Sequence, residues 1–435
     1  MNHKVEILNI TVGGFANVGK VKLSLDKFNA LVALNNYGKS NVINAIEFGI
    51  DFLKESIEDK AKMMALRSII PINKHIDKNP YSFEVELLTT FQNEDYIVSY
   101  GYSFDWIKND NKGKQIKDEF LKIKTIKPDS KYKTYIKRNT REGNYMSSPT
   151  GRCDKKISVK KSELIINKLS NFDDLFYNDI IEKIVKLDIV YIDTLQHPDR
   201  LFRQINTKVV KTGYSLSMPS TSDVGYFIYS LREKKSGLYE IFEDSVKSLL
   251  NDIEEFEPVE LDFKKEVKFD SEKVELPLDF PEKLYDIRVK ENNNNQQSSI
   301  NSLSSGSQKI FYILALTIAA ELNNVPIISF EELENSIHPG LLQRLLMILD
   351  GLTEKTKIIT SSHSPYLIQY LDTNKIKIGI PNSEGLAIFK EIRKSKFSKV
   401  VKIAEDEGIS VGDVIFDRVI ECSSGDYELL NELCY

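Results

Sequence analysis

The 435-residue sequence predicts an α/β protein built on a mixed central sheet, and three observations support this fold class. Residues 5–25 alternate apolar and polar side chains, a pattern typical of an antiparallel edge. Residues 28–34 form an apolar run of strand length, and the helical pattern of residues 42–53 follows it after a short loop. Two later apolar runs, 326–330 and 357–360, are also bounded by polar loops and helices, so we expect further strands of a buried sheet.

Composition limits the classes of function. Hydrophobic residues make up 41% and charged residues 28%, and the formal net charge is −5. This excludes a surface that is basic throughout, and the length suits two or three domains. Cys153, Cys422 and Cys434 lack the spacing of a zinc site or a disulfide framework. No secretory segment or membrane span is apparent, so we expect a cytoplasmic protein without a membrane partner.

The stretch from Ala33 to Asn41 (ALNNYGKSN) has the strand–loop–helix context of a phosphate-binding loop. Backbone N–H groups of such a loop, and the positive end of the helix dipole, face the phosphates. Lys39 would reach the β- and γ-phosphates, and the Ser40 hydroxyl would ligate Mg²⁺. Ala33 stands where the pattern has its first glycine, which a negative φ would allow. The alternative for this stretch alone is an ordinary strand–turn–helix.

Residues 81–91 and 95–106 predict a β-hairpin, and the chain then becomes basic. Residues 108–161 hold 17 Lys and Arg against 6 Asp and Glu, and period-2 pieces place lysines on one strand face. Two interpretations stay open for this segment. It is either a patch that follows a nucleic-acid backbone, with Tyr132 and Tyr135 between the lysines, or a solvated sheet face.

The central part of the chain predicts mostly helices. In order, we expect a helical segment at 162–186, a short buried strand at 187–192, a polar turn at 193–200, helical periodicity over 222–256, strand-like pieces at 258–290, and a polar surface loop at 291–299.

Residues 303–308 (LSSGSQ) open a long apolar helix predicted over 309–322. Serine and glycine at the start of a buried helix make a second anion-binding position. The alternative is a simple capped helix start.

Two adjacent carboxylates, Glu331 and Glu332, end the strand predicted at 326–330. Because neighbours in a strand point to opposite faces, one acid can hold Mg²⁺ while the next faces an attacking water. We assign Glu331 to the metal and Glu332 to the general base. His363 follows the strand at 357–360, where open α/β sheets place ligands, and could bind a γ-phosphate. A purely structural histidine is the alternative.

Four segments in this order, NNYGKSN, LSSGSQ, ISFEELENSIHP and TSSHSP, resemble the Walker A, signature, Walker B with D-loop, and switch histidine of ABC-type ATPases of the SMC/RecF/Rad50 kind. The GKSN opening, the EExE Walker B and the SSHSP switch are most similar to the OLD-like branch. That branch supplies ATPase subunits of anti-phage systems such as Gabija, Septu and PARIS. The resemblance covers residues 1–55 and 300–370; Glu331 departs from the more usual aspartate.

The resemblance implies an ATPase head that uses ATP and Mg²⁺, with an antiparallel β subdomain and a large insertion between Walker A and signature. Glu332 and His363 would be catalytic, and Ser40 and Glu331 would hold the metal. The nucleotide would be bound by Asn35, Asn36, Gly38, Lys39, Ser40, Asn41, Ser304, Ser305, Gly306 and Gln308. A glutamine of the first lobe is either Gln92 or Gln196, and Arg200 is either a phosphate sensor or a surface ion pair.

The resemblance also implies a head-to-tail ATP sandwich, and hence at least a homodimer, with a hexamer among the assemblies it allows. We expect four regions: an ATPase lobe at 1–106, an insertion at 107–290, a signature and Walker B lobe at 291–370, and a closure or docking segment at 371–435.

The last region is too short for a nuclease domain, and its acids (Asp413, Asp417, Glu421, Asp426) lack the order of one. Residues 408–421 suggest a strand followed by a helix. The leading hypothesis is therefore a slow ATPase that serves as sensor or scaffold in anti-phage defence, with a separate effector. The alternatives are a RecF-like repair ATPase that binds DNA through 108–161, and a protein that binds ATP without turnover.

Overall fold

The computed structural model describes residues 5–108, 112–140, 142–192, 218, 224–262, 283–380, 384–423 and 434. Contacts divide the chain into two compact units, which are treated separately below. Unit 1 comprises Met1–Tyr191, Pro326–Ser329 and Lys355–Tyr435, and unit 2 comprises Ile192–Val325 and Phe330–Glu354. Within the described ranges, no helix is both long and apolar enough to span a bilayer.

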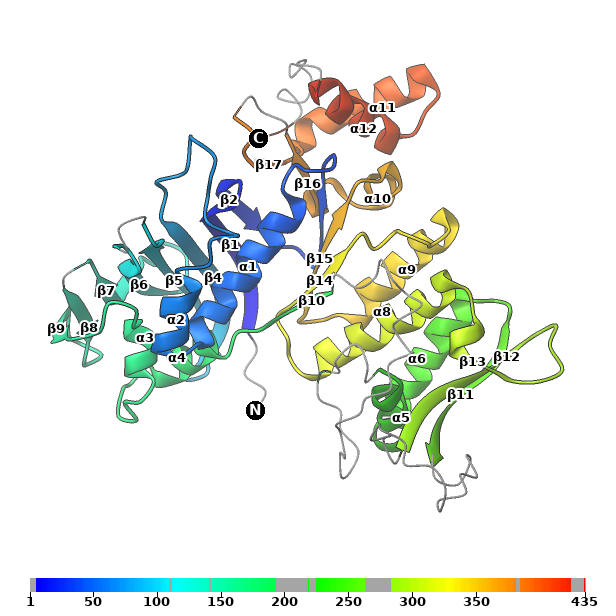
Figure 1. Ribbon diagram of the computed structural model, residues 1–435, viewed down its shortest axis with the longest axis horizontal. Helices are drawn as coiled ribbons and strands as arrows, with labels where there is room; N and C mark the ends of the chain where they lie inside the picture. Colours follow the sequence, from blue (N-terminus) through cyan, green and yellow to red (C-terminus); the bar gives the residue numbers. More distant parts are fainter. Residues whose placement is uncertain are drawn as a thin grey trace, which may run out of the picture. The chain divides into compact units, whose positions relative to one another are not determined.

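The larger sheet of unit 1 has eight strands in the order β2-β1-β4-β5-β6-β7-β8-β9, with every neighbouring pair antiparallel (Figure 1). The strands are β1 Val5–Phe15, β2 Val18–Ser24, β4 Tyr81–Phe91, β5 Glu94–Asp105, β6 Gln115–Thr125, β7 Lys133–Arg138, β8 Gly143–Met146 and β9 Cys153–Ile157. The predicted antiparallel edge and the hairpin of β4 and β5 are confirmed.

The basic segment is a continuation of this sheet. Strand β5 pairs with β6 from Tyr96↔Thr125 to Asp105↔Gln115, and β6 then pairs with β7. The expected boundary between residues 106 and 107 is therefore wrong as a boundary between compact units. Strand pairing across it joins the two segments, which a change of composition could not reveal.

The second sheet has the order β10-β14-β15-β3-β16-β17. Its strands are β3 Phe28–Val32, β10 Ile189–Ile192, β14 Ile327–Glu331, β15 Lys357–Ser362, β16 Ile376–Gly379 and β17 Phe389–Glu391. Strand β3 runs parallel to both β15 and β16, whereas β17 is antiparallel to β16. The sheet is mixed, so the predicted α/β class is confirmed.

Helix α1 (Lys39–Lys54) follows β3 and packs on β1, β2 and β4 of the larger sheet. In Figure 1 it runs along these strands. The Phe52 ring stacks on Phe104 at 4.9 Å between centroids. The hydroxyls of Tyr81 and Tyr102 each donate to a backbone carbonyl of α1, those of Ala45 and Gly49, at 2.7 Å. Aromatic burial and two buried hydrogen bonds therefore fix the helix that carries the phosphate loop.

Further helices of unit 1 are α2 Ile57–Met63, α3 Ile165–Leu169, α4 Asn178–Val185, α10 Pro365–Tyr370, the 3₁₀ turn η5 Thr373–Lys375, α11 Lys394–Glu407 and α12 Val411–Ser423. The helix expected over 162–186 is thus two short helices. The strand expected near residue 409 is wrong: Gly408 ends α11 at φ +70°, and the Ser410 hydroxyl accepts from the Asp413 N–H at 3.0 Å to start α12.

Unit 2 contains α5 Val224–Lys234, α6 Ser236–Leu249, β11 Ile253–Asp262, β12 Lys283–Glu291, β13 Ser298–Ser299, η4 Ile300–Ser302, α8 Ser305–Leu322 and α9 Pro339–Leu352. The strands form a three-stranded sheet, and α8 packs against α5, α6 and α9. Phe311 of α8 contacts Phe242 and Phe256 at 6.0 and 4.9 Å. The helical pattern predicted to residue 256 ends at Leu249, because residues 253–256 pair in β11 instead.

Candidate nucleotide-binding site

The loop between β3 and α1 has the backbone geometry that a phosphate site requires. Asn36 and Gly38 adopt left-handed conformations, with φ of +66° and +89°. Gly38 is the N-cap of α1, so it offers no side chain to cap the first turn, and that turn contains no acidic residue. The positive end of α1 is therefore compensated by neither a cap nor a carboxylate of its own, which favours an anionic ligand.

Lys39 lies inside this loop and is only 7% exposed. Its Nζ donates to the carbonyls of Ala33 and Leu34 at 2.8 and 3.1 Å. The loop thus wraps around its own ammonium group. A positive charge held in a concave turn at a helix N-terminus fits the triphosphate of a nucleotide.

The φ angle of Ala33 is not positive, so an alanine can occupy the position where the loop pattern has glycine. It is fully buried, and its N–H donates to the Ser362 carbonyl of β15 at 3.2 Å. The space for its methyl group comes from β16: a Cβ built on Gly379 would lie 2.5 Å from the Ala33 Cβ. A small residue on the neighbouring strand therefore accommodates the departure from the loop pattern.

Asn17, which the sequence did not single out, braces the loop from the turn between β1 and β2. Its Oδ1 accepts from Asn41 Nδ2 at 2.9 Å and would lie 2.7 Å from a Cβ on Gly38. Its carbonyl accepts from the Ala387 N–H at 3.0 Å. The Asn41 amide therefore holds the loop in place, while Asn35 and Asn36 are exposed and Ser40 is half-buried.

His363 directly follows β15, and Ser362 pairs in register with Val32 of β3. The phosphate loop and His363 thus leave adjacent parallel strands at the same edge of the sheet. The turn after His363 is fixed because the Ser362 hydroxyl accepts from the Ser364 N–H at 3.0 Å, and Ser364 caps α10 through the Tyr366 N–H. This edge is where open α/β sheets bind ligands.

In unit 2, Glu331 is the last residue of β14, and Glu332 leaves the strand with φ +49°. Glu332 therefore lies outside the strand, contrary to the expectation that both acids belong to it. A left-handed residue turns the chain, so strand alternation does not set the direction of the Glu332 side chain. Its carboxylate accepts from the Asn335 side-chain amide, and both acids are half-buried.

Lys309 of α8 is a second residue that the sequence analysis missed. It is 0% exposed, and its Nζ donates to the carbonyls of Glu332 and Asn335 at 2.9 and 2.8 Å. Burial lowers its pKa to about 8, while the nearby carboxylates of Glu334 and Glu332 act in the opposite direction. The only signal in the sequence was one lysine in an otherwise apolar helix.

The start of α8 exposes Ser304 and Ser305, and Ser304 caps the helix by accepting from the Ser307 N–H at 3.2 Å. Gln308 is a further residue of this motif for which nucleotide binding is expected. It is 4% exposed, and its Nε2 donates to the carbonyl of Leu303 at 2.9 Å. Its amide therefore holds the turn before α8.

The structure gives little support for the positions expected to supply a first-lobe glutamine or a phosphate sensor. Gln92 is an exposed turn residue with φ +50°, whereas Gln196 and Arg200 lie outside the described residues.

Among the residues that the structure describes, no group of three or more His, Cys, Asp and Glu side chains is placed to hold a metal. Mg²⁺ commonly takes one or two protein ligands and completes its shell with substrate phosphates and water, so it does not require such a group.

Some lysines of the basic segment lie over aromatic rings. Lys124 lies 4.6 Å from the centre of the Tyr132 ring, and the Tyr132 hydroxyl donates to Glu86. Tyr135, which stands between Lys133 and Lys137 in the sequence of β7, packs edge-on against Tyr177 with 5.0 Å between the ring centroids.

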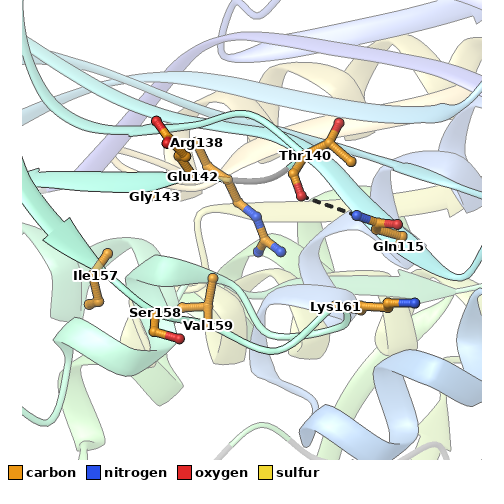
Figure 2. Close-up of a pocket in the computed structure, with 9 residues that line it drawn as sticks. All are labelled: Gln115, Arg138, Thr140, Glu142, Gly143, Ile157, Ser158, Val159 and Lys161. Atoms are coloured by element: carbon orange, nitrogen blue, oxygen red, sulfur yellow. Dashed lines mark hydrogen bonds between the residues drawn. The ribbon is translucent and has the colours of Figure 1, made fainter.

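A small pocket opens in the same region, with an accessible volume of about 110 Å³ (Figure 2). The Arg138 guanidinium points into it, but Arg138 is 6% exposed and donates to the carbonyls of Lys160 and Glu163. Those two bonds give the arginine a structural role. The Gln115 amide also has a structural role, because it donates to the Thr140 carbonyl across the pocket at 3.1 Å.

Comparison with known proteins gives a family. Residues 28–369 match the family described as "AAA domain, putative AbiEii toxin, Type IV TA system". A search of curated proteins finds no match.

Solved structures that are similar include three SMC head domains. The first is an SMC head bound to the C-winged helix domain of ScpA, with 15% identity, a TM-score of 0.46, and coverage of 91% of this chain and 99% of that one. The second is the SMC head of Thermotoga maritima, with 13% identity, a TM-score of 0.39, and coverage of 89% and 99%. The third is the SMC head with an extended coiled coil, bound to the C-terminal domain of ScpA derived from Pyrococcus furiosus, with 12% identity, a TM-score of 0.43, and coverage of 92% and 100%.

The family match spans more than half of the chain and includes the phosphate loop, the serines before α8, the paired glutamates and His363. This protein therefore belongs to the family described as AAA domain, putative AbiEii toxin, Type IV TA system.

Proposed function

We propose that this protein binds MgATP and hydrolyses it slowly, as a switch. The observation that carries the proposal lies within unit 1. The Lys39 loop and His363 follow adjacent parallel strands at one sheet edge, where the positive end of α1 has no cap and no acidic neighbour in its first turn. A loop of this kind binds the phosphates of a nucleotide through backbone N–H groups and the lysine ammonium.

In this proposal each side chain has one task. Lys39 would exchange its two carbonyl partners for phosphate oxygens, and Ser40 and Glu331 would hold Mg²⁺. The metal would neutralise charge that develops on the phosphates. Glu332 accepts a proton from the attacking water, and His363 donates a hydrogen bond to a γ-phosphate oxygen. ATP and Mg²⁺ are thus the cofactors that the proposal requires.

The exposed Ser304 and Ser305, at the N-terminus of α8, support a role toward a nucleotide held by a second copy of the chain. A helix N-terminus adds hydrogen-bond donors to a phosphate whose charge one loop leaves partly uncompensated. ATP would then join two copies, and turnover would be slow because product release requires them to separate.

We further propose that this ATPase is the sensor or scaffold of a bacterial anti-phage defence system, with a separately encoded effector. Two observations support this. The four motifs resemble those of the OLD-like branch, and the matched family is described as a putative toxin of a type IV TA system, hence one part of a two-component system. In the described part of 371–435, the Asp413 carboxylate accepts from the N–H and hydroxyl of Ser410 before α12, and Glu421 pairs with Arg418, so these acids have structural roles.

Phosphate release with purified protein tests the enzymatic part. Wild type should release phosphate from ATP only with Mg²⁺, and Lys39→Ala should lose nucleotide binding by about 100-fold, because two charge-assisted bonds are lost. Lys54→Ala is the matched control: it lies on the same helix, but its ion pair with Asp188 is at the surface. Equal binding by wild type and Lys39→Ala would overturn the proposal.

Co-expression with the products of neighbouring genes tests the biological part, since a scaffold should co-purify with its effector. Duplex DNA binding separates the repair alternative. Lys124 lies over the Tyr132 ring, and the Tyr132 hydroxyl donates to Glu86. These contacts give that alternative no support, so we expect Lys122→Glu/Lys124→Glu to leave DNA binding unchanged. Steep, salt-dependent DNA binding that this variant abolishes would favour the repair ATPase instead.

A further inference from the structure

A buried polar contact outside the phosphate loop joins Lys309 to the segment that follows β14. Lys309 Nζ bonds the carbonyls of Glu332 and Asn335, three residues apart, at 2.9 and 2.8 Å. The segment between these carbonyls is a turn, closed by the Asn335 N–H donating to the Glu332 carbonyl at 3.1 Å. Both groups belong to unit 2.

Packing alone does not require a lysine at this position. The rest of α8 is apolar almost all round, and burial of an ammonium group costs several kcal/mol unless hydrogen bonds offset it. Leucine or methionine would fill the space without that cost. The charge therefore matters for the two carbonyls it satisfies, and Glu332 and Glu334 help to keep it protonated near neutral pH.

The turn that Lys309 bonds is unusual because two of its residues have left-handed backbones. Glu332 has φ +49° and Ser336 has φ +64°. Such conformations cost on the order of 1 kcal/mol or more for a residue other than glycine, and persist only where the surroundings impose them. The Ser336 carbonyl also lies against α8, only 2.3 Å from a Cβ built on Gly306. Helix α8 thus fixes both ends of the turn.

We propose that Lys309 is a positioning residue for Glu332: by bonding the two carbonyls it holds the left-handed turn that directs the Glu332 carboxylate toward its task. Lys309 does not touch the reacting atoms. The Asn335 amide, which donates to the same carboxylate, completes the support. This inference rests on the proposed role of Glu332 as general base, and extends it to a residue on another helix.

The test compares Lys309→Met, which keeps the shape and removes the donor, with Lys309→Arg, which keeps donor and charge. Lys247→Met on α6 is the control, since Lys247 makes only a surface pair with Glu243. We expect Lys309→Met to lower kcat by about 10- to 100-fold with little change in KM, and Lys309→Arg to recover much of it. In a Glu332→Gln background, Lys309→Met should cause no further loss, because the effect passes through Glu332.

A second readout does not depend on activity. Hydrogen exchange of peptides covering residues 331–338 should accelerate in Lys309→Met, whereas residues 39–54 should exchange as in wild type. If Lys309→Met does not fold, Lys309→Gln, which can donate to one carbonyl, should give intermediate values in both measurements.

Unchanged exchange in 331–338 would overturn the inference, as would an equal loss of kcat on the Glu332→Gln background. The wild type could instead prove inactive while exchange in 331–338 still accelerates in Lys309→Met. That result would count against the proposed ATPase but would support the role of Lys309 in holding the turn.

Discussion

The methyl group of Ala33 faces the Cα of Gly379, on a neighbouring parallel strand, so closely that a Cβ on Gly379 would lie 2.5 Å from it. Ala33 opens the phosphate loop at a position where loops of this pattern have glycine. The two residues therefore form a pair: the glycine at position 379 leaves room for the methyl group that Ala33 brings to the loop. The pairing joins residues 346 positions apart, and no local pattern could have revealed it.

The contact between Ala33 and Gly379 predicts that Ala33→Gly compensates for the effects of Gly379→Ala. Gly379→Ala should destabilise the protein by about 1–3 kcal/mol through overpacking, and it should weaken nucleotide binding because the strain falls on the loop. Ala33→Gly/Gly379→Ala should recover most of both losses. Thermal unfolding and nucleotide titration measure the cycle, and Gly351→Ala, where a new Cβ meets nothing within 4 Å, is the neutral control. Purely additive losses would contradict the pairing.

Glu332→Gln should abolish proton transfer while it preserves nucleotide binding. Loss of a general base costs about 100- to 10,000-fold in the rate of the chemical step. We therefore expect ATP to accumulate in the complex, measured as nucleotide retained on the protein after gel filtration. Glu354→Gln, an exposed position of the same unit, should behave as wild type. Hydrolysis by Glu332→Gln at the wild-type rate would exclude this residue as the base.

Ser305→Arg should block association of two copies without preventing a single copy from binding ATP. Ser305 is exposed at the first turn of α8, so an arginine there fits the folded unit but occupies the space that the proposal reserves for a second copy's nucleotide. Light scattering in the presence of ATP, on a Glu332→Gln background, should show a monomer. Ser302→Arg, exposed one turn earlier, tests whether any added charge has the same effect. An ATP-dependent dimer of the Ser305→Arg protein would contradict the sandwich.

Lys60 predicts a pH dependence of stability. It is 1% exposed and donates to the carbonyls of Leu53 and Glu55 at the C-terminal end of α1, and burial lowers its pKa to about 8. The unfolded chain, with a lysine pKa near 10.5, then binds more protons than the folded protein between pH 8 and 10.5. Stability contributed at this site should therefore rise with pH across that window, by roughly 3 kcal/mol at most.

Urea unfolding of wild type and Lys60→Met, at several pH values from 7 to 10, measures that contribution by difference, since the other lysines and tyrosines titrate in both proteins. The gap in stability between Lys60→Met and wild type should shift in favour of wild type as pH rises. A gap that stays constant would show that Lys60 titrates normally.

The sequence predicted the parts of the site that depend on short-range patterns. Strand β3, the loop with Lys39, and β15 with His363 follow from apolar runs and polar loops, and the structure places both loops at one sheet edge. The hairpin of β4 and β5 was equally clear, because its alternation is long and its turn is short.

Two of the failed predictions have a common physical cause. Gly408 and Ser410 form a cap pair between helices, and Glu332 takes a left-handed φ, so in both places local backbone chemistry overrides the alternation on which the prediction rested. Lys309 was missed for a different reason. A lysine in an apolar helix shows that a partner is needed, but its acceptors lie more than twenty residues away in a turn that only the fold creates.

The central place of β3 in its sheet has a consequence for synthesis of the chain. Its two neighbours, β15 and β16, end at Ser362 and Gly379, so a ribosome must deliver some 340 further residues after the phosphate loop before that loop gains its supporting strands. Contacts of such long sequence separation form late. Chains truncated before residue 357 lack both neighbours of β3, so we expect them to be unable to bind nucleotide.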